Sequence, residues 1–398
     1  MNKNRLLLLA VAAVVAVGIA VVLSGRQAPA EQASSGGALV DGLADSVNAV
    51  TAVSVTDGAQ QVTLSRAGGV WSVAERSGYR ADISALRKKL LALVESRRLE
   101  GKTTNPERYV QLGVSDLSEN DGDDQNLKVD VTGEQSFQLL VGKRANARSG
   151  TYVRFADQAQ SWLASGDLRF SANPKDWLKK DVLDLPANRI RRVTLVHSSG
   201  DKIALSKATP DAPNFDVTNV PEGREVLSPS AGNSIASAVA GLRFDEVAPS
   251  SSESFQQLEI VQGTFETFDG LRIGTRTFAR DDKFYLMLDV AFDDALANED
   301  IPAPALDEGG LEASTPDADE DGNFESPEMA QAAADAAEKA ARVAAADSAK
   351  QEAADLAPLV NGWVFEIPSY KHGNLSKSLE DLLKPLDDGT DDGSEAEG

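Results

Sequence analysis

Cysteine is absent from the 398-residue chain, and histidine occurs only twice. Without cysteine the chain has no disulfide framework and no site for attaching a lipid to a cysteine. His197 and His372 lie far apart in the sequence and lack the spacing of metal ligands, so they predict no catalytic centre. The sequence also lacks a nucleophile elbow, a P-loop and a dinucleotide-binding fingerprint. These absences predict that the protein is not an enzyme and has no catalytic or cofactor-binding residues.

Basic residues are scarce in the second half of the chain. Residues 1–200 contain 25 basic and 21 acidic side chains, whereas residues 201–398 contain 14 and 41. The formal net charge of the whole chain is -23 at pH 7. Because phosphate backbones repel so acidic a protein, we do not expect a nucleic-acid partner.

Long hydrophobic runs are equally scarce, with one exception at residues 6–23. As a helix this run would be about 27 Å long, close to the hydrocarbon thickness of a bilayer. Lys3 and Arg5 precede it, which by the positive-inside rule places the N-terminus in the cytoplasm. The sequence therefore predicts an anchor at 1–26, a flexible tether at 27–45 and a periplasmic body, as a single-pass protein of the bacterial inner membrane. Cleavage of a signal peptide after residues 28–30 is the alternative, and it exports the same body.

The body shows strand and helix signals that occur twice in the same order. In each half, short strands are followed by a capped helix, then more strands, and then a short helix. The first series has its capped helix after Asp82, and the second has one after Ser228. We therefore predict an α+β fold with an internal duplication of one mixed strand and helix module with antiparallel sheets. The two modules are placed at residues 46–185 and 186–386.

Two segments interrupt the second module. Residues 291–326 form an acidic loop, and residues 327–357 are rich in alanine and predict a long helix. The helix has almost no large apolar side chains, so we expect it to project into solvent or to rest on a partner. Residues 387–398 are acidic and rich in glycine, and we expect a disordered tail.

One part of the acidic loop matches the calcium-binding template D-x-[DN]-x-[DN]-G-x5-E. In this template, oxygen ligands at alternate positions surround a turn glycine. The candidate ligands are Asp317, Asp319, Asp321, Asn323 and Glu328. The other interpretation is a solvated acidic linker, since matches of this kind arise easily in acidic segments.

Four segments of the chain, and the order in which they follow one another, resemble a bacterial family known as domain of unknown function 4340. They are the Trp71 strand at 70–73, the tyrosine, leucine, glycine turn at 109–114, the strand end at 140–142 and the strand at 150–154. Trp177 matches a later tryptophan of that family. The resemblance implies single-span envelope proteins encoded beside ABC transporters of the gliding-motility type. It implies no catalytic residues.

These observations lead to one expected function and two alternatives. We expect a membrane-anchored periplasmic accessory or binding protein, associated with an ABC-type transport complex or an envelope component. The first alternative is an envelope hydrolase that acts through carboxylates, and the second is a calcium-responsive adaptor. A hydrolase needs two convergent acids with shifted pKa values, whereas a binding module needs an exposed apolar or charged face.

Overall fold

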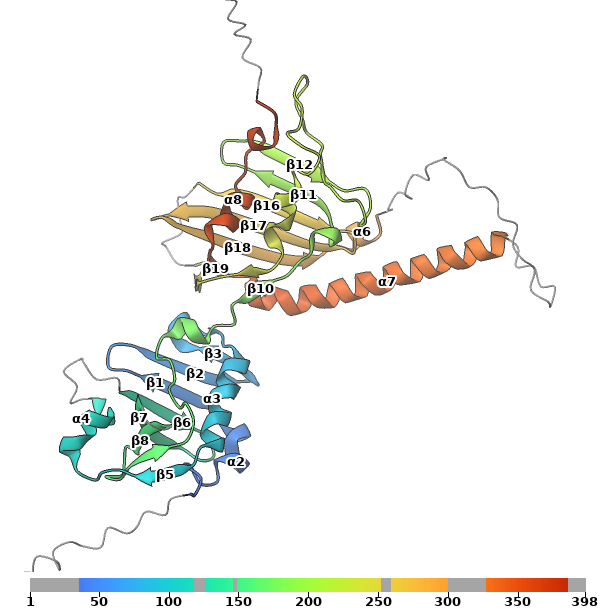
Figure 1. Cartoon of the computed structure of the whole chain (residues 1–398). Helices are drawn as coiled ribbons and strands as arrows, with labels where there is room; N and C mark the ends of the chain where they lie inside the picture. Colours follow the sequence, from blue (N-terminus) through green and yellow to red (C-terminus); the bar gives the residue numbers. More distant parts are fainter. Residues whose placement is uncertain (1–35, 118–125, 146–148, 252–258, 300–326, 386–398) are drawn as a thin grey trace, which may run out of the picture. The chain divides into compact units, whose positions relative to one another are not determined.

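The computed structural model describes residues 36–117, 126–145, 149–251, 259–299 and 327–385 (Figure 1). The chain divides into two compact units. One contains Met1–Glu75 and Ala81–Trp177, and the other contains Arg76–Arg80 and Leu178–Gly398.

The first unit is built on a large antiparallel sheet with the strand order β3-β2-β1-β6-β7-β8-β9-β5. Alternate side chains of β1 and β2, such as Val53 and Leu64, are fully buried, as expected for strands with one face against a core. The strands are β1 (Ala52–Thr56), β2 (Gln61–Ala67), β3 (Val70–Val73), β5 (Arg98–Gly101), β6 (Leu127–Thr132), β7 (Phe137–Arg144), β8 (Thr151–Phe155) and β9 (Ser161–Ala164).

Helix α3 (Ile83–Glu95) is the main helix of the first unit. The carboxylate of Asp82 accepts hydrogen bonds from the backbone N–H groups of Ser84 (2.8 Å) and Ala85 (3.2 Å), which fixes where the helix begins. Its buried residues, Leu86, Leu90 and Leu93, recur at helical spacing and form one face. The remaining helical segments are short: α2 (Leu43–Ser46), η1 (Val47–Ala49), η3 (Pro106–Arg108), α4 (Tyr109–Leu112) and η5 (Pro174–Trp177).

The second unit contains another antiparallel sheet, with the order β13-β12-β11-β16-β17-β18-β19-β15. Phe265 and Ile273, which pair across β16 and β17, are both fully buried. The strands are β11 (Ile190–Val196), β12 (Lys202–Ser206), β13 (Asp216–Val217), β15 (Glu246–Pro249), β16 (Val261–Thr267), β17 (Leu271–Arg280), β18 (Lys283–Phe292) and β19 (Trp363–Ile367).

Smaller elements complete the second unit. β10 (Asp181–Leu183) pairs with β14 (Leu242–Arg243) in a separate small sheet. Tyr79, in β4 (Tyr79–Arg80), packs edge-on against Phe244 and Trp363 with ring centroids 5.4 and 4.9 Å away. The helical segments are η2 (Ala74–Arg76), η6 (Ala187–Arg189), α5 (Asn233–Ala236), η7 (Ser237–Val239), α6 (Asp294–Ala297), α8 (Ser369–Leu375) and η9 (Glu380–Leu382).

The two sheets have the same strand order. Each strand of the second sheet corresponds to the strand of the first whose number is ten lower, from β13 and β3 at one end to β15 and β5 at the other. The turn between β8 and β9 corresponds to the connection between β18 and β19, which contains α6 and α7. Hairpin turns at a sheet end tolerate insertions well, because little packing depends on them.

Helix α7 (Pro327–Val360) runs away from this insertion point as a long rod (Figure 1, orange). Ala349, Ala353 and Val360 are buried, whereas residues 332–341 are all exposed. Arg189 holds the inner part in place by pairing with Glu352 and with Asp269, each at 2.8 Å. The outer part of α7 therefore owes its helical form to the high propensity of alanine.

The predicted fold class and membrane location require correction. The α+β prediction is wrong because two large antiparallel sheets dominate the structure, and the helix expected after Ser228 is only a short segment. In the described ranges, no helix combines the length and the apolar character that crossing a bilayer requires. The predicted transmembrane helix at 6–23 lies outside those ranges. The single-pass inner-membrane assignment therefore finds no support in the structure and is withdrawn.

Asp281 and Asp282 form the turn between β17 and β18 in the left-handed conformation, with φ of 51° and 59°. Such type I′ hairpin turns favour glycine, which adopts positive φ without a steric penalty. We expect Asp282→Gly to raise the free energy of unfolding of the second unit by up to about 1 kcal/mol. Urea denaturation measures this change. Arg280→Gly, a change inside β17, should instead be destabilising, and a destabilised Asp282→Gly protein would contradict the prediction.

Candidate functional site

Three of the four segments that carry the family resemblance, at 109–114, 140–142 and 150–154, meet around one buried arginine in the first unit. The Arg154 guanidinium lies 4.5 Å from the ring centre of Tyr109. It donates hydrogen bonds to the backbone oxygens of Val114 (3.0 Å) and Gln158 (3.2 Å), and it pairs with Asp116 at 2.7 Å. Because the Arg154 guanidinium is used up in these contacts, the cluster holds the fold together.

Gly142 explains another part of the same motif. A Cβ atom at this position would lie 2.2 Å from the backbone oxygen of Leu112 and 2.6 Å from that of Gly113. Only glycine therefore lets β7 approach the end of α4 so closely. Gly113 has a positive φ of 71°, which ends α4 and turns the chain toward Val114. These motif residues are structural.

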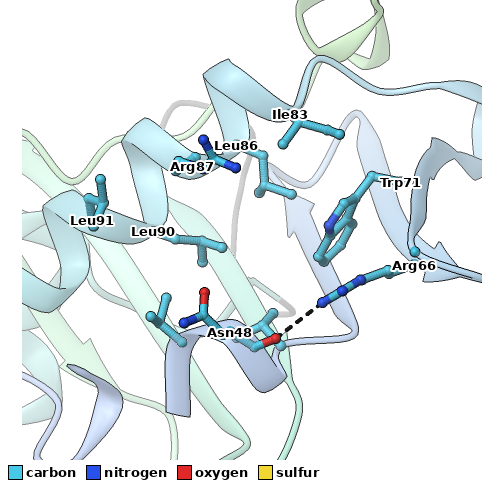
Figure 2. Close-up of a pocket in the computed structure, with 11 residues that line it drawn as sticks. Asn48, Arg66, Trp71, Ile83, Leu86, Arg87, Leu90 and Leu91 are labelled. Atoms are coloured by element: carbon cyan, nitrogen blue, oxygen red, sulfur yellow. Dashed lines mark hydrogen bonds between the residues drawn. The ribbon is translucent and has the colours of Figure 1, made fainter. Parts of the chain in front are cut away.

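A groove of about 320 Å³ lies between α3, η1 and the hairpin formed by β2 and β3 (Figure 2). We call it the α3 groove. Trp71 points into it from β3, and Leu86 and Leu90 point toward the indole ring from α3 (Figure 2). Its principal lining residues are Asn48, Arg66, Trp71, Ile83, Arg87 and Leu91.

Local sequence explains the apolar part of the α3 groove. Gly68 and Gly69 adopt positive φ and form the tight turn that places Trp71 on the inner face of β3. Ile83 and Leu91 lie outside the buried stripe of α3, and 43% and 45% of their surfaces are exposed. The groove therefore combines a buried aromatic floor with two large apolar side chains that remain open to solvent.

Hydrogen-bond donors surround this apolar surface. Arg66 crosses the groove and donates from Nη1 to the backbone oxygen of Asn48 at 3.1 Å (Figure 2). No carboxylate of the described residues pairs with Arg66 or Arg87. Within the same residues, the Trp71 indole N–H also has no hydrogen-bond partner. A ligand with negatively charged acceptor atoms next to an apolar side chain fits this arrangement.

Of the five predicted calcium ligands, only Glu328 lies in the part of the chain that the structure describes. Asp317, Asp319, Asp321 and Asn323 lie outside the described ranges, and Glu328 lies in the first turn of α7. The ranges that the structure does cover contain no group of three or more histidine and acidic residues able to hold a metal ion. The calcium site is therefore not tested by the structure.

Both histidines make structural contacts in the second unit. His197 Nε2 lies 2.8 Å from the backbone oxygen of Lys377. His372 Nδ1 lies 2.9 Å from Oγ1 of Thr277, and its ring stacks on Phe284 with centroids 4.7 Å apart. Burial lowers the pKa of His372 below its usual value of 6.5.

This lowered pKa predicts a pH dependence of stability. The unfolded chain binds a proton at His372 at a higher pH than the folded chain does, so the folded state loses stability as pH falls. We expect the free energy of unfolding of the second unit to decline between about pH 7.5 and pH 5.5. The decline should be smaller in His372→Gln. Urea denaturation at several pH values measures both slopes, and equal slopes would contradict the prediction.

Carboxyl groups with a resolved pKa shift in the described part of the chain are all shifted downward. Hydrogen bonds from the Ser378 backbone and side chain lower the pKa of Asp381. The hydrogen bond from Arg192 lowers the pKa of Glu299, and that from Lys384 lowers the pKa of Glu225. Asp167 is also shifted down, since hydrogen bonds from Arg144 and the Arg169 backbone outweigh the opposing effect of burial. These groups are anchored hydrogen-bond acceptors rather than proton donors.

Sequence reasoning did not identify the α3 groove. One available signal was that Ile83 and Leu91 are apolar but lie off the stripe of Leu86, Leu90 and Leu93. The sequence does not place Arg66 and Arg87 in one groove, because that depends on how α3 packs on the sheet.

Comparison with known protein families matches residues 71–289, more than half of the chain, to the family described as "Domain of unknown function (DUF4340)". The matched range contains Trp71, Tyr109, Gly142 and Arg154. No curated protein and no solved structure matches the chain.

Proposed function

The chain belongs to the DUF4340 family, as its resemblance predicted, and from this premise we propose that it is a binding protein whose α3 groove holds an acidic peptide segment of a partner protein. One observation carries the proposal. The same groove contains exposed apolar side chains and two arginines that have no carboxylate partner among the described residues. No catalytic step is part of the proposed function.

The apolar contribution comes from the exposed side chains of α3. Ile83 and Leu91 both line the groove and remain exposed to solvent, with Ile83 on the side of Trp71 and Leu91 farther along α3 (Figure 2). Large apolar side chains that stay open to solvent, next to a buried aromatic ring, are typical of binding surfaces. A leucine-sized side chain of a partner would cover them and displace water from the floor.

The electrostatic contribution comes from Arg66 and Arg87. A guanidinium group binds a carboxylate through two parallel hydrogen bonds, and the free indole N–H of Trp71 adds a further donor. Acidic side chains on either side of an apolar anchor would therefore meet donors at both edges of the groove. This recognition favours carboxylate-containing peptides over neutral or basic ones.

A hydrolase that acts through carboxylates has weaker support. A general acid at neutral pH needs a raised pKa, which burial or a neighbouring carboxylate provides. The described carboxyl groups with resolved shifts, Asp167, Glu225, Glu299 and Asp381, are shifted the other way. None of them lines the α3 groove.

The identity of the partner protein stays a prediction from the family resemblance. That resemblance implies a subunit of an ABC-type transport complex or another envelope component. Co-purification of the full chain with its partners addresses this directly. The proposal expects the captured protein to contain an exposed acidic segment with large apolar residues.

A binding experiment with two variants tests the groove itself. We expect a synthetic peptide in which leucine alternates with glutamate to bind the full chain and to change Trp71 fluorescence. Arg66→Gln/Arg87→Gln should weaken binding by roughly tenfold or more, because two charge-assisted contacts are lost. Arg97→Gln/Arg108→Gln removes the same charge elsewhere on the first unit and serves as the control.

The outcome separates specific recognition from general charge attraction. Equal weakening in both double variants would show that only net charge matters, and the proposal would fail. The same peptide with lysine in place of glutamate should not bind. Binding of both peptides with similar affinity would also refute the proposed recognition.

A further inference from the structure

A second hollow opens at one end of the sheet in the first unit. It lies where the turns between β6 and β7 and between β8 and β9 meet the segment that precedes α2, and its volume is about 440 Å³. This volume falls within the range of roughly 300–1,000 Å³ in which proteins hold small molecules. The residues that matter for its chemistry are Asp41, Arg98, Phe137, Gln138, Asp157 and Gln158.

Several polar side chains of this hollow have unused hydrogen-bonding capacity. The amides of Gln138 and Gln158 and the carboxylate of Asp157 make no side-chain hydrogen bond to any described residue. Each amide offers two donor hydrogens and one acceptor oxygen, and the carboxylate offers two acceptors. Donors and acceptors are therefore both available within one small volume.

The other walls of the hollow are fixed in position. Gln135 donates from Nε2 to the backbone oxygen of Asp41 at 2.7 Å, which ties two of the three segments together. Arg98 donates to the backbone oxygen of Leu39 at 2.9 Å and lies over the Trp162 ring, 5.4 Å from its centre. Asp41 lies 3.5 Å from Arg98, so the positive charge of Arg98 is partly neutralised.

An aromatic wall completes the hollow. Phe137 and Phe155 pack edge to face, with ring centroids 6.3 Å apart and an interplanar angle of 70°. Phe155 is buried, whereas Phe137 remains partly exposed and presents apolar surface to the hollow. A ring of this kind provides the apolar contact that the C–H face of a sugar makes.

We infer that this hollow is a binding site for an uncharged sugar residue of a glycan. Sugar hydroxyl groups both donate and accept hydrogen bonds, so they match the mixed amides and carboxylates better than a purely anionic or apolar ligand does. Arg98 lies close to Asp41, and Asp157 adds a second carboxylate to the lining, so the hollow also disfavours anions, in contrast to the α3 groove. The inference rests on residues separate from those of the proposed peptide-binding function.

Calorimetric titration of the full chain with chitotetraose, cellotetraose and maltotetraose tests this inference. We expect saturable binding of at least one of them. Gln138→Ala/Asp157→Ala should weaken that binding by about tenfold, because it removes two side chains that hydrogen-bond to hydroxyl groups. Gln111→Ala/Asp45→Ala, which changes the same residue types elsewhere on the first unit, should bind as the parent does.

Three results would overturn the inference. They are the absence of saturable binding for all three oligosaccharides, binding that Gln138→Ala/Asp157→Ala leaves unchanged, and equal loss in the control variant. Arg66→Gln/Arg87→Gln should bind the oligosaccharide normally. Failure of the peptide experiment alone would therefore leave this site standing, and the reverse also holds.

Discussion

Replacing Gly142 by alanine is expected to lower the free energy of unfolding of the first unit by about 3 kcal/mol or more. The added Cβ would lie 2.2 Å from the Leu112 oxygen and 2.9 Å from the carbonyl carbon of Gly113. Both are backbone atoms, so no side-chain rotation relieves the overlap. Either β7 or the end of α4 must move, which also disturbs Val114 and its hydrogen bond from Arg154.

Urea denaturation followed by tryptophan fluorescence measures this loss. Gly37→Ala is the matched control, because a Cβ at Gly37 meets no atom within 4 Å and its φ is not positive. The control should change stability by less than about 0.5 kcal/mol. A Gly142→Ala protein as stable as the control would show that the close approach of β7 and α4 is wrong.

Truncating Phe265 to alanine is expected to destabilise the second unit by about 3–5 kcal/mol. Phe265 is fully buried at the centre of the sheet, where it pairs with Val193 on β11 and with Ile273 on β17. Removal of the ring takes away its buried apolar surface and leaves a cavity that the flanking strands cannot close.

The comparison for this prediction is Val196→Ala on the neighbouring strand β11. Val196 is 39% exposed, so its truncation should cost less than about 1 kcal/mol. Urea denaturation gives the two values, and hydrogen exchange locates the loss to β16 and its neighbours. Similar costs for the two variants would contradict the placement of Phe265 in the core.

Local chemistry was sufficient to predict some elements from the sequence. Asp82 caps α3, and the apolar spacing of Leu86, Leu90 and Leu93 gives the helix its buried face. The hairpin between β1 and β2 depends on Asp57, whose carboxylate accepts hydrogen bonds from the backbone of Ala59 and Gln60, and on Gly58 with a φ of 87°. Each signal lies within a few residues of the element that it specifies.

The helix expected after Ser228 is much shorter in the structure, and short turns held by side-chain hydrogen bonds surround the helices of the second unit. After four residues α5 passes directly into the 3-10 segment η7, and the Asn233 side chain accepts a hydrogen bond from the Phe215 N–H. Asp381 likewise accepts from the backbone and hydroxyl of Ser378, which leaves only short turns after α8.

Neither proposed site could be predicted from local sequence. The α3 groove joins Arg66 on β2 with Arg87 on α3, and the sugar site joins Asp41, Gln138 and Asp157 from three separate segments. Each depends on strand register and on the packing of α3, which no short window of sequence specifies. Sequence signals for such sites are weak because the same residue types are common on solvated surfaces.

The most direct test of peptide binding in the α3 groove follows the Trp71 indole N–H by NMR. The chain has four tryptophans, and Trp71→Phe assigns the relevant signal. On titration with the leucine and glutamate peptide, we expect the Trp71 signal to shift and saturate while those of Trp162, Trp177 and Trp363 stay in place. An unchanged Trp71 signal, or equal shifts of all four, would contradict binding in this groove.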